Sequence, residues 1–299
     1  MIPQMATAPT APLRSRYGGA RSDLLGRWSA NLENRIHPMI RPLTTNDLAA
    51  AAQLTTGDRY ALLGHLRWQL HTPYASAFVV EHGGQLVGLA CSIQHATSAF
   101  IGHVFVHPTQ RRMRVGSALV QHLCAHCANE GATTLSTQIP GSNMDFWQAM
   151  GFTPQGRYLR YSSGLHIDAS RDEVLLLEPT HTLALLRLDA HATGEDRRTL
   201  LLEHRFVAHV YVAQGHVLGG MLPLLGHGLI LAESPTVGLE LQRWLLPHQT
   251  HIVVPEANTA ACAHLVERTY RPEPAGVRMV RGALLPYRPE LIYAWPWGL

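Results

Sequence analysis

The sequence contains no lysine. All 24 basic residues are arginine, against 21 aspartates and glutamates, which gives a formal net charge of +3. Charged residues make up 15% of the 299 positions, below the roughly 25% of an average domain. Nucleic-acid-binding proteins concentrate positive charge on one face, so we expect no nucleic-acid partner. The sparse charge leaves room for a buried interface such as that of a homodimer.

Cysteine and long apolar runs are also scarce. The four cysteines, Cys91, Cys124, Cys127 and Cys262, are too few and too scattered for a disulfide-stapled secreted module, which favours a reducing, cytoplasmic compartment. The longest apolar stretch, residues 219–232, is shorter than the about 20 residues of a membrane-spanning helix. We therefore expect no membrane partner.

Residues 1–38 lack both an apolar core pattern and the continuous apolar segment of a secretory signal. Three interpretations remain open: a flexible extension, a start codon upstream of the true one, or a weak organelle-transit peptide. Patterned sequence begins at Met39, so these residues are predicted to be dispensable.

Apolar runs and helical segments alternate from Met39 onward. The patterns predict strands at 40–43, 99–108 and 134–139, a hairpin around Gly83 and Gly84, and helices at 46–54, 60–70, 115–129 and 143–150. A polar stretch, 165–178, is typical of a linker. Residues 179–299 then repeat the order of 39–164: QLVGLACSI resembles HVLGGMLPL, and PGSN resembles PEAN. This order predicts two tandem α/β (α+β) domains.

The most informative segment is VHPTQRRMRVGSALVQHLC, residues 106–124. A predicted strand ends there, an arginine-rich loop follows, and a helix begins with small residues. Backbone N–H groups and the positive end of a helix converge at such a junction, which suits a diphosphate. The alternative is a solvated basic loop that caps an ordinary helix.

This segment resembles the acetyl-coenzyme A motif of the GNAT (GCN5-related) N-acetyltransferases, Q/R-x-x-G-x-G/A after a bulged strand. Arg111 and Gly116 match, and Arg114 stands where the first glycine is usual. FWQAMGF, residues 146–152, is similar to another family segment. The resemblance covers 39–164 and implies a mixed, mostly antiparallel sheet flanked by helices. Residues 179–299 resemble the degenerate second domain of tandem GNAT proteins and lack the arginine loop, so we expect one cofactor site per chain.

The resemblance also implies which residues bind acetyl-CoA. The backbone of the splayed strand would contact the pantetheine and thioester, the loop and helix start would hold the diphosphate, and two residues would line the pantetheine arm. In that order they are Val104, Phe105 and Val106; Arg111, Arg112, Met113, Arg114, Val115, Gly116, Ser117 and Ala118; and Asn143 and Trp147. Asn143 and Trp147 have alternative roles as a helix cap and a core aromatic.

The implied activity is direct transfer of an acetyl group to a primary amine of a small molecule or peptide. The family's usual glutamate base is absent, and His103 is the candidate catalytic base, with a packed strand histidine as the alternative. Trp147 replaces the usual tyrosine acid, which leaves Tyr158, Tyr161 or water as proton donor. Such weak acid–base chemistry favours an amine of lowered pKa. A non-catalytic CoA-binding regulatory protein and a ligand-free scaffold are the alternatives.

Two further segments contain residues of functional interest. His122, Cys124, His126 and Cys127 have metal-ligand spacing, but both cysteines fall on the apolar side of the predicted helix. Buried thiols are predicted there, and no metal. The C-terminal LIYAWPWGL is expected to form a strand and an apolar lid that shapes an acceptor pocket between the halves.

Overall fold

The structure is a computed structural model that describes residues 39–165, 169 and 172–296. Met39–Leu299 form one contact unit. The expectations for residues 1–38, and those for residues 166–168, 170–171 and 297–299, lie outside the described residues. None of the described helices is both long enough and apolar enough to cross a bilayer.

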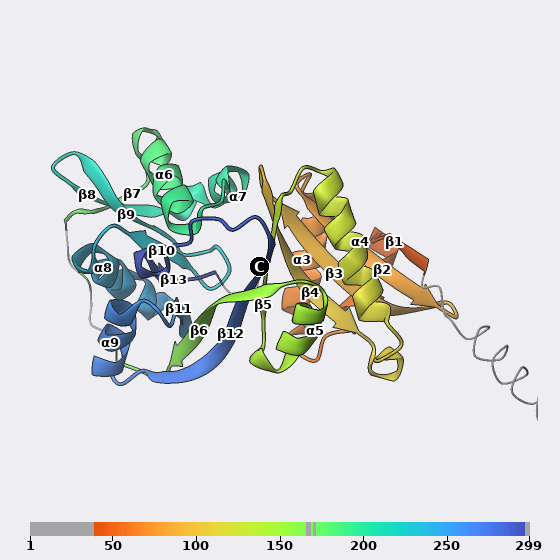
Figure 1. Ribbon diagram of the computed structural model, residues 1–299. Coiled ribbons are helices and arrows are strands. Elements are labelled where there is room, and N and C mark those ends of the chain that lie inside the picture. The colour runs from red at the N-terminus through yellow and green to blue at the C-terminus, as the bar shows by residue number, and fades with distance from the viewer. Residues whose placement is uncertain (1–38, 166–168, 170–171, 297–299) are drawn as a thin grey trace, which may run out of the picture. The chain divides into compact units, whose positions relative to one another are not determined.

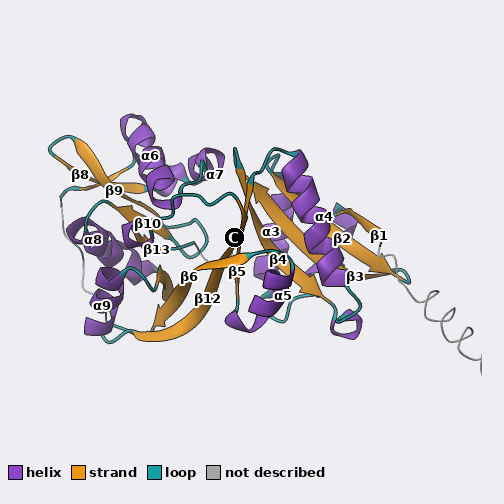
Figure 2. Cartoon of the chain, viewed as in Figure 1, coloured by secondary structure: helices purple, strands orange, loops and turns teal. Residues whose placement is uncertain are grey.

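The first half follows the predicted order closely (Figures 1 and 2). Its elements are β1 (Met39–Pro42), α2 (Leu48–Ala52), α3 (Arg59–His71), β2 (Ala75–His82), β3 (Gln85–Gln94), β4 (Ser98–Val106), α4 (Val115–Asn129), β5 (Thr134–Ile139), α5 (Met144–Ala149) and β6 (Thr153–Ser162). The bounds of α4 and β5 are those predicted. The helix expected at 46–54 is shorter because its first turn, Thr45–Asp47, is a 3-10 turn.

The second half repeats part of this order. Its elements are β7 (Val174–Leu176), α6 (Thr182–Thr193), α7 (Arg198–Glu203), β8 (His209–Ala213), β9 (His216–Leu222), β10 (Leu229–Ala232), α8 (Pro235–Leu245), β11 (His251–Pro255), α9 (Thr259–Glu267), β12 (Arg271–Gly282) and β13 (Ile292–Ala294). Asn258 caps α9 by accepting a hydrogen bond from the Ala261 amide, so PEAN opens a helix as predicted.

Two sheets form the framework. The larger has the order β1-β2-β3-β4-β5-β12-β6-β11, and the smaller has the order β13-β10-β9-β8-β7. All described pairs are antiparallel except β4 with β5. The fold is therefore the mixed, mostly antiparallel class that was expected.

Strand β12 of the second half lies in the sheet of the first half. It pairs with β5 on one side and β6 on the other (Figure 1). Val277 and Met279 of β12 consequently join the core of the first half. The two halves follow one another in the chain, and strands from both form the larger sheet.

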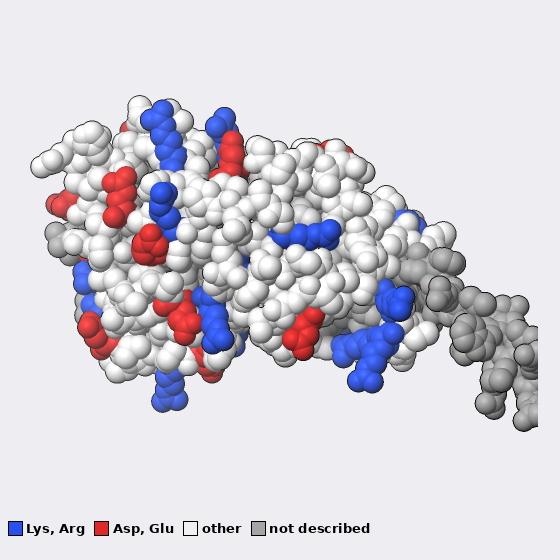
Figure 3. Space-filling view, in the orientation of Figure 1, with Lys and Arg blue, Asp and Glu red and all other residues white. Residues whose placement is uncertain are grey.

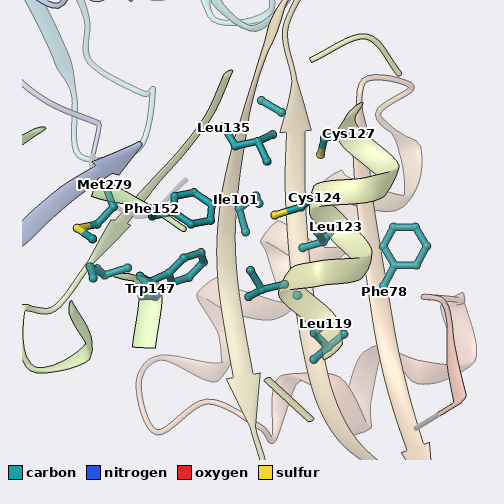
Figure 4. Packing of buried hydrophobic residues seen from close by; sticks show 14 of the residues in the cluster. Phe78, Ile101, Leu119, Leu123, Cys124, Cys127, Leu135, Trp147, Phe152 and Met279 are labelled. Carbon is teal, nitrogen blue, oxygen red and sulfur yellow. The ribbon is translucent and has the colours of Figure 1, made fainter. Parts of the chain in front are cut away.

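Helix α4 covers one face of the first sheet. Leu119, Leu123 and Cys124 of α4 pack against strand residues such as Phe78 and Ile101 (Figure 4). A Cβ at Gly88 of β3 would lie 2.9 Å from Leu119 Cδ1, so glycine permits this close approach. Cys124 and Cys127 are buried free thiols, as predicted. The opposite face, covered by α2 and α3, forms a separate core.

Candidate functional site

Strand β4 separates from β5 halfway along its length. It pairs with β5 only from Ser98 to Ile101, and from Gly102 to Val106 it pairs with β3 alone. Leu89 of β3 pairs with Phe105, while Cys91 pairs with Gly102, so β4 carries an extra residue. His103 at this bulge has a φ of 51°. The structure therefore confirms the bulged, splayed strand that the resemblance implies.

Val104, Phe105 and Val106 lie on this splayed segment. Among the described residues, their backbone groups on the β5 side have no strand partner. An open row of N–H and C=O groups is a template for another extended chain. The three residues thus occupy the position predicted for them, and their contact with a cofactor stays a prediction.

The arginine loop joins this open edge to the start of α4. Arg111, Arg112, Met113 and Arg114 are all exposed. Within the described part of the chain, the amides of Val115, Gly116 and Ser117 have no backbone acceptor, as expected for the first turn of a helix. Several free donors and the positive helix end therefore coincide beside three arginines.

Arg114 adopts the left-handed backbone conformation, with φ 62° and ψ 9°. Glycine is usual at this motif position, and glycine reaches this conformation without a steric penalty. Arg114 therefore adopts the backbone turn of the motif, but its side chain makes this conformation strained. Arg112 has a φ of 66° and shares this feature.

Gly116 brings the helix start close to β4 and α5. A Cβ there would lie 3.4 Å from Val106 Cγ2 and 3.7 Å from the Phe146 ring. These are ordinary contact distances, so the protein itself leaves room for alanine. Phe146, which the sequence analysis did not select, is the α5 aromatic that faces the junction.

Asn143 and Trp147 are placed differently from each other. Asn143 is exposed before α5 and makes no side-chain cap hydrogen bond. Trp147 is 4% exposed and packs in the core beside Phe152 and Met279 (Figure 4). The core-aromatic alternative thus describes the position of Trp147, and its contact with pantetheine stays a prediction. Phe146, the adjacent aromatic residue of α5, is half-buried and lies on the side of the helix that faces Gly116.

His103 lies on the sheet face that α3 covers. Its ring stacks on His65 of α3, with the ring centroids 4.1 Å apart. Burial lowers the pKa of His103 to about 4 and that of His65 to about 3, where the neighbouring His103 contributes as well. His103 is therefore neutral at pH 7 and has a free lone pair, but it is a weak proton acceptor.

The two tyrosines considered as proton donors are buried in the cores of the second half. Tyr158 shares a hydrogen bond of 2.7 Å with Tyr287, and Tyr161 packs in a different cluster. Burial raises the pKa of both phenols. Both belong to β6, on the far side of β12 from β5, so the splayed edge of β4 does not adjoin them.

A small cavity lies on the same sheet face as His103, where the two halves meet. Its lining includes Phe100 and Gln138 from the first half and Glu195, Arg278, Trp295 and Pro296 from the second. Its volume of about 20 Å³ is room for one ordered water. The buried Arg278 guanidinium pairs with Glu195 beside it. The C-terminal segment thus contributes to this cavity through Trp295 and Pro296.

Residues 43–152 match the model of the acetyltransferase (GNAT) family. The match covers the part of the chain that contains the splayed strand and the arginine loop. No curated protein sequence matches the chain. Solved structures share its fold: a proposed acetyltransferase from Pyrococcus horikoshii has a TM-score of 0.72 at 18% identity, with 86% of this chain and 93% of that chain covered.

Two further GNAT structures extend over both halves. A tandem GNAT protein from the clavulanic acid biosynthesis pathway has a TM-score of 0.52 at 18% identity and covers 81% of this chain and 98% of its own. A GCN5-related N-acetyltransferase from Sphaerobacter thermophilus has a TM-score of 0.58 at 16% identity, with coverage of 85% and 99%. The tandem GNAT fold therefore accounts for both halves.

The second half differs from the GNAT domain at the position equivalent to the splayed edge. There, β10 is followed by α8 just as β4 is followed by α4, but β13 pairs along β10. The Asn258 side chain donates to the carbonyls of Glu290 at 3.0 Å and Ile292 at 2.9 Å. The Tyr293 ring lies against Gly238 of α8. The chain itself thus occupies in the second half the edge that is open in the first.

Proposed function

We propose that the protein is an N-acetyltransferase that transfers an acetyl group from acetyl-CoA directly to a primary amine of a small molecule or peptide. The single observation that carries the proposal is the continuity of the open β4 edge with the free amides of α4. In this proposal the edge would offer backbone groups to an extended pantetheine arm, and the unpaired amides of Val115, Gly116 and Ser117 would donate to the diphosphate. The GNAT family match over residues 43–152 supports the same chemistry.

The chain's own contribution to the reaction is binding and polarisation. A backbone N–H of the 104–106 segment would donate to the thioester oxygen, whose charge increases as the amine attacks. A preorganised donor of this kind contributes typically about 3 kcal/mol. The neutral amine attacks the thioester carbonyl carbon and forms the C–N bond, and the C–S bond breaks. The proton that the amine loses passes to the leaving thiolate, directly or through water, and gives free CoA thiol.

The weak basicity of His103 restricts the acceptor. An amine with a pKa near 10.4 requires about 4 kcal/mol for deprotonation at pH 7.4, whereas an α-amino group with a pKa near 8 requires less than about 1 kcal/mol. His103, with its pKa lowered to about 4, accepts a proton less readily than water-exposed histidine does. We therefore propose an amino acid, a peptide N-terminus or another amine of lowered pKa as the acceptor.

The acceptor approaches, in this proposal, from the sheet face that bears His103. Trp68 and Tyr74 from the first half both donate hydrogen bonds to Glu203 of α7, so the second half reaches this face. The second half would then complete the acceptor pocket and bind no acyl-CoA itself, because β13 occupies its equivalent edge.

The test combines binding with turnover. Calorimetry with acetyl-CoA should show one site per chain, and release of free CoA thiol should be fastest with amines of pKa near 8. A protein that binds acetyl-CoA but releases no thiol above background with any amine is the non-catalytic CoA-binding protein. Absence of binding would exclude both functions, and activity confined to polyamines or lysine side chains would contradict the proposed acceptor.

A further inference from the structure

Three metal-ligating side chains meet behind the bulge of β4. His65 comes from α3, Cys91 from β3 and His103 from β4, and one ligand atom from each lies within 4.8 Å of the other two. The bulge brings His103 next to Cys91, because Cys91 pairs with Gly102. Among the described residues, this is the one group of three histidine, cysteine, aspartate or glutamate side chains with ligand atoms so close together.

These donor atoms have little other bonding. Nδ1 of His103 is buried and has no hydrogen-bond partner among the residues that the structure describes. Cys91 is 1% exposed, and its thiol makes neither a disulfide nor a hydrogen bond within that same part of the chain. Buried polar atoms in proteins are normally paired, so unpaired donors grouped in this way need a reason.

Gln69 supplies a second, separate indication. Its amide nitrogen lies 3.0 Å from Nε2 of His65, while its own Oε1 is buried without a partner in the described chain. If the Gln69 side-chain amide is flipped, its Oε1 accepts a hydrogen bond from Nε2–H of His65, and Nδ1 of His65 is free to bind a metal. Histidine ligands of metals usually have their second ring nitrogen held in this manner.

We propose that His65, Cys91 and His103 form a binding site for a divalent transition-metal ion of the zinc class. Two imidazole nitrogens and one thiolate are a donor set that Zn²⁺ and Co²⁺ prefer. Metal–ligand bonds of about 2.0–2.3 Å require the ligand atoms of a tetrahedral site to lie roughly 3.3–3.8 Å apart. Rotation of the side chains that moves each ligand atom by about 1 Å would bring the three atoms to this spacing. As the bond to sulfur forms, the Cys91 thiol releases its proton to solvent.

The other cysteine–histidine segment does not compete for this role. Cys124 and Cys127 lie in the core between α4 and the larger sheet, whereas the His122 and His126 rings both lie against Phe78. Although the spacing of these residues in the sequence resembles that of metal ligands, the described structure does not bring three of their ligand atoms together. The site on α3, β3 and β4 has no such spacing signal, since its members are far apart in the chain.

Cobalt spectroscopy tests the proposal without any acyl donor, so its outcome is independent of the proposed function. Untagged protein with reduced thiols is titrated with Co²⁺. One ion should bind per chain with a thiolate-to-cobalt charge-transfer band, and Zn²⁺ should abolish the band by displacement. Cys91→Ala should remove the band. His65→Gln and His103→Gln should each weaken Zn²⁺ binding by more than about 100-fold, and Gln69→Ala by about 10-fold.

Matched controls separate this site from adventitious binding. Cys124→Ser changes another buried thiol, and a His122→Gln, His126→Gln double variant removes a pair of histidines on α4. Both should retain the cobalt band. The proposal is overturned if no band appears, if the band persists in Cys91→Ala, or if the double variant removes it. Should Cys91→Ala fail to fold, undiminished Zn²⁺ affinity in both His65→Gln and His103→Gln overturns it.

Discussion

His103 lies against His65 with the ring centroids 4.1 Å apart and the ring planes tilted by 32°, and both residues are half-buried. Burial holds the pKa of His103 at about 4 and that of His65 at about 3, below the ordinary value of 6.5. Protonation of either ring in the folded state therefore requires a pH well below 6.5. The pair therefore links folding to pH.

For the metal-free protein, we expect the free energy of unfolding to decrease as the pH falls from 7 to 5. The unfolded chain binds protons at both histidines below about pH 6.5, and the folded chain does not bind them until the pH approaches their lowered pKa values. His65→Phe should reduce this loss of stability by about 2 kcal/mol. Urea unfolding at the two pH values measures it. Gly64→Ala, beside His65 on α3, provides a control that leaves both imidazoles in place and should leave the pH dependence unchanged.

Gly116→Asp should bind acetyl-CoA roughly tenfold less tightly, which is a change of about 1.4 kcal/mol, because it puts a negative charge beside the helix amides proposed to hold the diphosphate. Alanine is allowed at this motif position and its Cβ would have ordinary contacts with Val106 and Phe146, so Gly116→Ala should bind acetyl-CoA as the wild type does. Gly64→Asp on α3 is the control for the added charge, because a Cβ there has no neighbour within 4 Å. Equal affinities for Gly116→Asp and Gly64→Asp would contradict a diphosphate at the start of α4.

Arg114→Gly should be about 1 kcal/mol more stable than Arg114→Ala, because only glycine relieves the left-handed backbone at this position. Thermal unfolding of the two variants gives the difference. Arg111, whose φ is −64°, is the control. There the order should reverse, since glycine mainly adds freedom to the unfolded chain. The same order at both positions would argue against strain at Arg114.

Glu195→Gln should lower the free energy of unfolding by about 3–5 kcal/mol, because it leaves the buried Arg278 guanidinium without its anionic partner. The side chains of this pair are 2% and 3% exposed. Glu273→Gln disrupts the exposed ion pair with Arg160, whose side chains are 59% and 48% exposed, and should change stability by less than about 1 kcal/mol. Chemical denaturation of both variants measures the contrast. A small effect at Glu195 would mean that solvent reaches the pair.

Local sequence patterns predicted the individual elements well. The apolar spacing of 115–129 and the run at 134–139 gave the observed bounds of α4 and β5, since both depend on periodicity and on neighbouring turn residues. The arginine loop was also recognisable, because a strand end, a loop and a helix start are contiguous in the chain. The different placements of Phe146, which lies near Gly116, and Trp147, which packs in the core, could not be predicted, because the sequence does not define which side of a short helix faces a distant glycine.

The sequence by itself determined the helix and strand segments, the arginine loop before α4 and the small share of charged residues. Only the tertiary structure decided that β12 lies between β5 and β6, that β13 occupies the edge of β10, and that His65, Cys91 and His103 meet. The reason is physical. Periodicity specifies which face of a strand or helix is apolar, whereas the choice of partner depends on pairing and packing among residues that are distant in the chain.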